Sequence, residues 1–128
     1  MQILVVTQDH IVLDLLNDKS IQATGNFTIF NQTKDPLEII SVVHSQSPSM
    51  LILDDDMLKP NSSKILKSIK QITQNKVVIF LTSDNSLELG REISPLGVYY
   101  YGIKPISKEI ILDLINSVKS KNKSITIS

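Results

Sequence analysis

The sequence predicts an α/β fold in which a parallel sheet is covered by helices on both faces. Five short apolar runs, rich in β-branched residues, alternate along the chain with five segments whose apolar residues recur at helical spacing. The connections between these segments are short, and alternation of this kind calls for parallel strands joined by crossover helices. The strands are expected at residues 2–6, 27–30, 50–53, 76–81 and 98–103.

Each predicted helix has an apolar stripe, and most have a recognisable first residue. Asp9 can act as the N-cap of the first helix, and Pro36 suits the first turn of the second. The five stripes are Ile11, Val12, Leu15 and Leu16; Leu37, Ile40, Val43 and His44; Ile65, Leu66, Ile69 and Ile72; Leu87, Leu89, Ile93 and Leu96; and Ile110, Ile111, Leu114, Ile115 and Val118. The last helix is predicted over residues 107–119. We expect one domain over residues 1–120, and a frayed tail or the start of a linker over 121–128.

The composition excludes several classes of protein. With 128 residues, of which 41% are hydrophobic and 20% charged, the chain can form one globular domain. Basic and acidic residues both number 13, so net charge gives no reason to expect direct contact with nucleic acid or a membrane surface. The absence of cysteine excludes disulfides and is compatible with the cytoplasm, which is the expected location. No run is long enough to span a bilayer.

Polar residues follow three of the predicted strands. Five strand–helix units suit the doubly wound, flavodoxin-like strand order 2-1-3-4-5, in which ligands bind beyond the carboxyl ends of the strands. Asp54 follows the third strand, Thr82 and Ser83 follow the fourth, and Lys104 follows the fifth. A carboxylate can attack a phosphoryl donor, and a lysine and a hydroxyl can stabilise the charge on the transferred group. The arrangement therefore favours phosphoryl transfer.

Three segments in register resemble the receiver domain of bacterial two-component response regulators. They are residues 48–54 (PSMLILD), 78–83 (VIFLTS) and 97–105 (GVYYYGIKP), and the resemblance extends over essentially the whole chain. It implies that Asp54 is the phosphoacceptor and that Thr82 and Lys104 assist the transfer. Thr82, Ser83 and Tyr101 would form the switch. It further implies that a sensor histidine kinase or a phosphotransfer protein is the partner.

The sequence departs from the family at the expected Mg²⁺ site. The family holds Mg²⁺ with two acidic residues after the first strand, and Thr7 and Gln8 stand at those positions here. A one-residue slip that would move Asp9 into the pair breaks the apolar stripe of the following helix, so we predict that the acidic pair is lost. Asp54 and the backbone carbonyl of Asp56 would remain as ligands, with a weak contribution from Gln8 or Asp9. Mg²⁺ binding is therefore predicted to be weak or absent.

Two functions stay open at this stage. The first is a receiver domain that accepts a phosphoryl group on Asp54 and switches a protein-interaction surface, with no enzymatic turnover beyond self-catalysed transfer to and from that residue. The second is a pseudo-receiver, in which Asp54 and Lys104 form a structural ion pair and partners bind without phosphorylation. The surface formed by residues 87–119 could dock a partner or a second copy of the chain. A flavin or nucleotide enzyme is disfavoured, because no glycine-rich loop follows the first strand.

Overall fold

The computed structural model describes residues 1–73 and 75–127, and its centre is a five-stranded parallel sheet. The strand order is β2-β1-β3-β4-β5, which confirms the predicted doubly wound topology. Every strand begins and ends within two residues of its predicted bounds. The strands are β1 Gln2–Val6, β2 Asn26–Phe30, β3 Met50–Asp54, β4 Val77–Thr82 and β5 Tyr100–Ile103.

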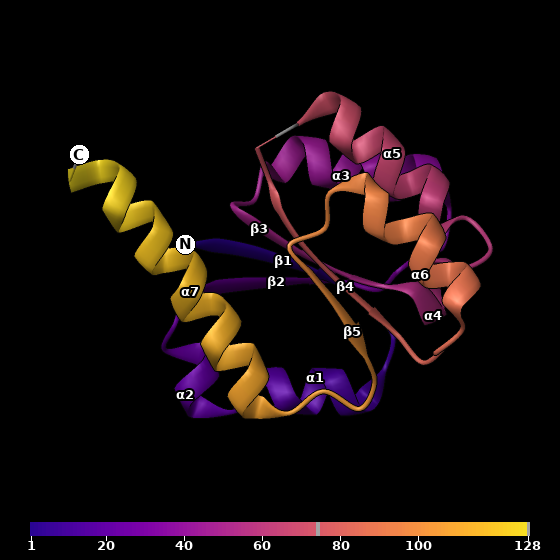
Figure 1. Ribbon diagram of the computed structural model, residues 1–128. Coiled ribbons are helices and arrows are strands. Elements are labelled where there is room, and N and C mark those ends of the chain that lie inside the picture. Colours follow the sequence, from indigo (N-terminus) through magenta and orange to yellow (C-terminus); the bar gives the residue numbers. More distant parts are fainter. Residues whose placement is uncertain (74, 128) are drawn as a thin grey trace.

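Helices cover both faces of the sheet (Figure 1). α3, α5 and α6 pack on one face, and α1, α2 and α7 pack on the other, while the short α4 lies at the carboxyl end of β3. The helices are α1 His10–Leu16, α2 Lys19–Gln22, α3 Pro36–Gln46, α4 Asp55–Leu58, α5 Ser62–Ile72, α6 Leu87–Ile93 and α7 Lys108–Ile127, with a 3₁₀ turn at Ser94–Leu96. The one-turn helices α2 and α4 were not predicted. No helix in the described part of the chain is both long and apolar enough to cross a membrane.

Two hydrophobic cores lie on opposite faces of the sheet because successive strand residues point to opposite sides. On β3, Leu51 and Leu53 face α3 and α5, whereas Met50 and Ile52 face α1 and α7. The central strands β1, β3 and β4 are almost entirely buried, which explains why each reads as a continuous apolar run. Their carboxyl ends are therefore held rigidly beside one another.

The phase of two helices differs from the prediction. In α1, Val12 and Leu16 are buried, while Ile11 is 69% exposed. In α3, the buried residues are Ile39 and Val43, and the predicted stripe members Leu37 and His44 are exposed. Apolar residues on these helices satisfy a 3.6-residue period in more than one phase, and the sequence alone does not choose between them.

The last helix is longer than predicted. α7 continues through Lys119 to Ile127, so the segment expected to fray is helical as far as Ile127, while Ser128 lies outside the described residues. The segment 120–127 contains neither proline nor glycine, and nothing in its sequence ends a helix. A domain boundary at residue 120 stays a prediction.

Candidate functional site

Asp54 is the last residue of β3, and its carboxylate is almost completely buried at the carboxyl edge of the sheet. Only 1% of the residue is exposed. Lys104 Nζ lies 2.7 Å from its Oδ1, which also accepts a hydrogen bond from the Asp56 amide at 3.0 Å. The Thr7 hydroxyl donates to Oδ2 at 2.6 Å. Both carboxylate oxygens therefore have donors, as a buried carboxylate requires.

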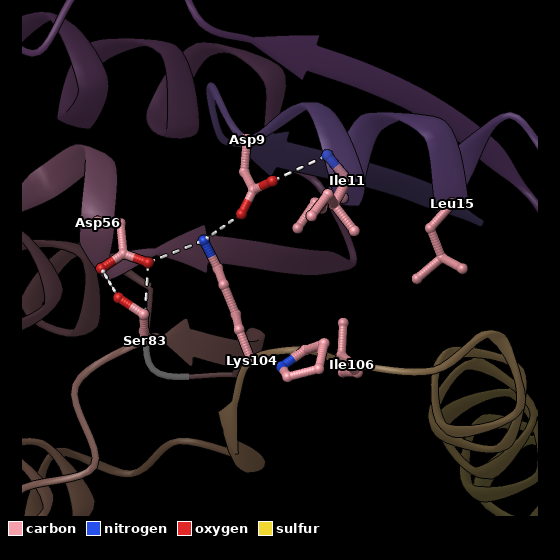
Figure 2. Close-up of a pocket in the computed structure, with 9 residues that line it drawn as sticks. Asp9, Ile11, Leu15, Asp56, Ser83, Lys104 and Ile106 are labelled. Carbon is pink, nitrogen blue, oxygen red and sulfur yellow. Dashed lines mark hydrogen bonds and ion pairs between the residues drawn. The ribbon is translucent and has the colours of Figure 1, made fainter.

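Lys104 lies at the point where three carboxylates converge. Its Nζ is 2.7 Å from Asp54, 2.8 Å from Asp9 and 3.0 Å from Asp56. Figure 2 shows the ammonium between Asp9 and Asp56, with dashed lines to both side chains. The carboxylates come from residues after β1, at the end of β3 and in α4, and three carboxylates with one ammonium leave a formal charge of −2. We call these four side chains the Lys104 cluster.

Contacts within the cluster favour the charged forms of Lys104, Asp9 and Asp56. Burial disfavours the Lys104 ammonium, but hydrogen bonds to Asp54, Asp9 and Asp56 outweigh this and raise its pKa well above the usual value. The hydrogen bond from Lys104 lowers the pKa of Asp9 against the opposing effect of burial. Burial also opposes ionisation of Asp56, yet donors from Ser83 and Lys104 leave its pKa below the usual value. Lys104, Asp9 and Asp56 are thus charged at neutral pH, and Lys104 forms ion pairs with both carboxylates.

The structure brings Asp9, and not Gln8, into contact with the Lys104 cluster. Asp9 Oδ1 caps α1 by accepting the Ile11 amide at 2.8 Å, and its Oδ2 meets Lys104. Gln8 instead donates its side-chain amide to the Asn31 carbonyl at 3.0 Å. Of the two residues predicted as weak metal ligands, Asp9 is therefore the one that bonds to Lys104: α1 begins at His10, which leaves the N-cap side chain facing the edge of the sheet.

Thr82 is near the site, but its hydroxyl does not face Asp54. It donates to Asp55 Oδ2 at 2.8 Å, and the Ser62 hydroxyl donates to Asp55 Oδ1 at 2.6 Å. The alternation of side chains explains this, because Thr82 shares a sheet face with Phe80, toward α5. Ser83, predicted as part of the switch, donates to Asp56 Oδ1 at 2.7 Å.

Tyr101 packs inward on the same face. Its ring stacks on Phe80 with centroids 5.5 Å apart and an interplanar angle of 13°. Its hydroxyl is buried and has no hydrogen-bond partner among the described residues. Burial, followed by the charges of Asp55 and Asp84, raises the pKa of this hydroxyl. Tyr101 therefore lies against β4, and its predicted part in a switch stays a prediction.

Mg²⁺ is the ion that the resemblance implies, and the donor types of the Lys104 cluster suit it. Asp9, Asp54 and Asp56 supply the hard carboxylate oxygens that Mg²⁺ prefers. These oxygens are arranged around the Lys104 ammonium, and no group of three acidic, histidine or cysteine side chains within residues 1–73 and 75–127 is placed to hold a metal ion. An ion here would have to share the carboxylates with Lys104.

A hollow of about 510 Å³ adjoins the Lys104 cluster. One wall is polar and includes Asp9, Asp56 and Lys104, while the opposite wall is apolar and includes Ile11, Leu15 and Ile106. In Figure 2 the labelled apolar side chains lie beside Lys104, away from the Asp56 side. A partner that reaches the cluster from this side would meet apolar surface next to the charges.

The sequence reading missed two residues as contributors to the site. Thr7 was considered only as a lost metal ligand, yet it is fully buried and bonds to Asp54. Asp55 was not among the predicted site residues, yet it is 3% exposed and accepts hydrogen bonds from two hydroxyls. A signal for Thr7 was present, because a polar residue continuing a fully apolar strand is buried and must find a partner.

The lowered pKa of Asp9 predicts a loss of stability in acid. A carboxyl whose folded-state pKa lies below its usual value of 3.8 stabilises the fold above that value, and the contribution disappears as the pH falls through the folded-state pKa. Asp9→Ser keeps a capping oxygen and removes the charge. Its deficit in unfolding free energy against the parent, measured by urea titration, is expected to be largest near neutral pH and to vanish in strong acid. A deficit independent of pH would contradict the ion pair with Lys104.

Three comparisons with known proteins bear on the family and the fold. The family model described as "Response regulator receiver domain" matches residues 3–116. Sporulation initiation phosphotransferase F of Bacillus subtilis is 26% identical over 114 residues, which cover 89% of this chain and 90% of that protein. The chemotaxis response regulator CheY4 of Vibrio cholerae is similar in structure, with a TM-score of 0.73, 18% identity and coverage of 91% and 97% of the two chains.

A second solved structure, the beryllofluoride-activated NtrC4 receiver domain dimer, has a TM-score of 0.77 at 20% identity and covers 94% of this chain and 97% of that one. At these identities the solved structures establish the fold, and the family model, which matches most of the sequence, establishes the family. The chain belongs to the response regulator receiver domain family.

Proposed function

We propose that this receiver domain accepts a phosphoryl group on Asp54 and so relays a signal within a two-component phosphorelay. One observation carries the proposal: a carboxylate that is 1% exposed at the end of β3 is bonded to a lysine ammonium at 2.7 Å. Both residues of the pair line a smaller hollow of about 260 Å³, from which a donor could approach. Receiver domains are generally signalling domains, and self-catalysed transfer is the extent of the chemistry we assign to this one.

The reaction is a transfer between two nucleophiles. A carboxylate oxygen of Asp54 forms a bond to phosphorus as the bond between phosphorus and the donor's leaving atom breaks, and the leaving atom keeps the electron pair. The product carries up to two negative charges on the phosphoryl oxygens, in place of the single charge of the Asp54 carboxylate. Lys104 is placed to offset them, because its raised pKa keeps it charged at any physiological pH.

Mg²⁺ would bind to this domain weakly. Receiver domains typically bind Mg²⁺ through acidic residues, and Asp9, Asp54 and Asp56 are the residues that would hold it here. When bound, the ion would add positive charge beside the phosphoryl oxygens. Because the carboxylates already share one ammonium, the affinity is expected to be lower than in a site whose carboxylates are unpaired. The backbone carbonyl of Asp56 stays a candidate ligand, as predicted from the sequence.

A histidine kinase or a phosphotransfer protein is the expected donor, since receiver domains interact with partners of these kinds. Ile11, 69% exposed, and Ile106 lie on the apolar wall of the 510 Å³ hollow, and we propose that the donor covers them. On the far side of β5, Leu87 and Ile103 are 74% and 43% exposed. They suit a second interaction surface on α6, β5 and α7, through which the domain could dock a partner or form a homodimer. Neither a direct contact with nucleic acid nor one with a membrane is part of the proposal.

Incubation with acetyl phosphate and Mg²⁺ tests the proposal. Intact mass spectrometry of the parent chain is expected to detect one added phosphoryl group, and Asp54→Asn is expected to reduce the incorporated fraction at least about tenfold, because the amide is a poor nucleophile. The matched control is Asp35→Asn, which removes an exposed carboxylate at the start of α3 and leaves the Lys104 cluster intact.

Equal labelling of the parent and Asp54→Asn would place the acceptor elsewhere. No labelling from acetyl phosphate or from a phosphorylated donor protein would overturn the proposal and leave the alternative, a pseudo-receiver that binds partners without phosphorylation. The retained Asp54, Thr82 and Lys104 favour the phosphorylated receiver.

A further inference from the structure

Asp55 is an unusual group to find in the core of this domain. It is a carboxylate with 3% exposure, it has no lysine or arginine ion-pair partner among the described residues, and two hydroxyl groups satisfy its oxygens. Ser62 donates to Oδ1 and Thr82 to Oδ2. A buried carboxylate oxygen that loses its donor costs free energy comparable to the desolvation of the group. Each of these two hydrogen bonds therefore contributes to the stability of the fold.

Thr82 has no further hydrogen to give. A hydroxyl is a single donor, and that of Thr82 is directed at Asp55, while its oxygen accepts the Asp84 amide at 2.9 Å. If Thr82 is to donate to a phosphoryl oxygen on Asp54, it must first release Asp55. The release leaves Asp55 Oδ2 without a donor in a buried site.

A spare donor is buried on the same face of the sheet. Tyr101 pairs with Phe80 in the β4–β5 register, and Thr82 is two residues beyond Phe80, so Tyr101 and Thr82 are diagonal neighbours on one face. Diagonal neighbours lie within reach of an aromatic side chain. The Tyr101 hydroxyl is buried and has no partner in the described part of the chain. Besides burial, the charge of Asp55 raises its pKa, which agrees with a hydroxyl close to that carboxylate.

We propose that Asp55 is a shared acceptor, whose carboxylate holds the Thr82 hydroxyl in the resting domain and takes the Tyr101 hydroxyl when Thr82 turns toward a phosphoryl group on Asp54. This inference rests on the proposed function. The exchange conserves the number of hydrogen bonds to Asp55 and gives an acceptor to the Tyr101 hydroxyl, which at rest has none among the described residues. Asp55 is thus a positioning residue that couples the acceptor edge to the tyrosine on β5.

The exchange predicts that the roles of Asp55 and Tyr101 are coupled in the activated state. Beryllofluoride with Mg²⁺ serves as the phosphoryl mimic, and its affinity is measured through backbone amide resonances. Tyr101→Phe removes only the hydroxyl and is expected to weaken beryllofluoride binding about tenfold, because a hydrogen bond to a charged acceptor is lost. In an Asp55→Asn background the same change is expected to cost less than about twofold.

Asp84→Asn is the matched control, because Asp84 is the second carboxylate that acts on Tyr101 and its side chain caps the Ser86 amide at the surface. In this background Tyr101→Phe should keep its full tenfold effect. A direct readout uses protein labelled with carbon-13 at tyrosine Cζ. The Tyr101 resonance, assigned by its absence in Tyr101→Phe, should shift on activation of the parent as its hydroxyl gains an acceptor. This readout tests whether the Tyr101 hydroxyl gains an acceptor on activation, even if Asp55→Asn does not fold.

The outcomes separate the two proposals. If the amides of Asp54 and Lys104 respond to beryllofluoride but Tyr101→Phe costs the same in both backgrounds, or the Tyr101 Cζ resonance stays in place, the shared acceptor is wrong and the proposed function stands. If the parent shows no response at Asp54 or Lys104, and no phosphoryl incorporation, both fail.

Discussion

Replacing Lys104 with methionine is expected to lower the free energy of unfolding by about 3 kcal/mol, the lower end of the range for breaking a buried ion pair. The methionine keeps the volume of the side chain and removes its charge. Asp9, Asp54 and Asp56 would then converge with no counter-charge. Asp54 has a side-chain exposure of 2% and cannot escape to water, whereas Asp9 and Asp56, at 25%, can turn outward and limit the loss.

Urea denaturation measures this loss, and Lys108→Met supplies the control. Lys108 pairs with Asp18 at 3.5 Å, and both side chains are more than a third exposed, so its loss is expected to cost less than about 1 kcal/mol. Divalent cations should then partly rescue Lys104→Met. An ion at a hundred times its dissociation constant adds about 2.7 kcal/mol. Equal losses in the two variants, or no rescue by Mg²⁺ or Mn²⁺, would contradict the convergence of the carboxylates on Lys104.

The sheet was predictable from the sequence because its central strands are buried on both faces. β1, β3 and β4 read as continuous apolar runs, and nothing else in the chain competes with them for that role. Helix phase was less predictable: Leu37 and Ile39 are both apolar, and only packing against β1 and α5 decides that Ile39 is buried. The sequence contains both possibilities, and tertiary contacts select one of them.

The same distinction holds at the site. That Asp54, Thr82 and Lys104 share one edge follows from the strand order, which the sequence predicts. The strand order alone does not determine the hydrogen-bond partner of each of these side chains. Thr82 faces Asp55 because it lies two residues after Phe80 on β4, an alternation that the sequence contains and that the prediction did not use. The contact of Asp9 with Lys104 joins residues 95 positions apart and depends on where α1 begins.

The departure at Thr7 leads to the second large expected effect. Thr7 is fully buried, donates to Asp54 at 2.6 Å and accepts the Asp9 amide at 3.0 Å. Thr7→Asp would restore an acidic residue where the family has one, and would set a second carboxylate beside Asp54. Repulsion between two carboxylates that share a site disfavours ionisation of both, so the pKa of one is raised.

The sign of the resulting pH dependence follows from that shift. When the folded-state pKa of a carboxyl is raised, the fold loses stability as the pH rises above the pKa that the carboxyl has in the unfolded chain. The loss is complete once the pH exceeds the folded-state pKa. At neutral pH and without metal, Thr7→Asp is expected to be about 3 kcal/mol less stable than Thr7→Asn, since each unit of pKa shift corresponds to about 1.4 kcal/mol. The asparagine has nearly the same size and can still donate to Asp54, so the comparison isolates the charge.

Mg²⁺ is expected to reverse much of this loss, because the new carboxylate adds an oxygen ligand to those of Asp54 and Asp9. The apparent Mg²⁺ affinity of Thr7→Asp, obtained from unfolding curves at increasing Mg²⁺, should exceed that of the parent at least about tenfold through the added charge. If Thr7→Asp and Thr7→Asn are equally stable without metal, residue 7 does not face Asp54. If they differ but Mg²⁺ has no effect, the ion pairs with the Lys104 ammonium exclude the metal. Introducing one acidic residue at position 7 is then not enough to create Mg²⁺ binding.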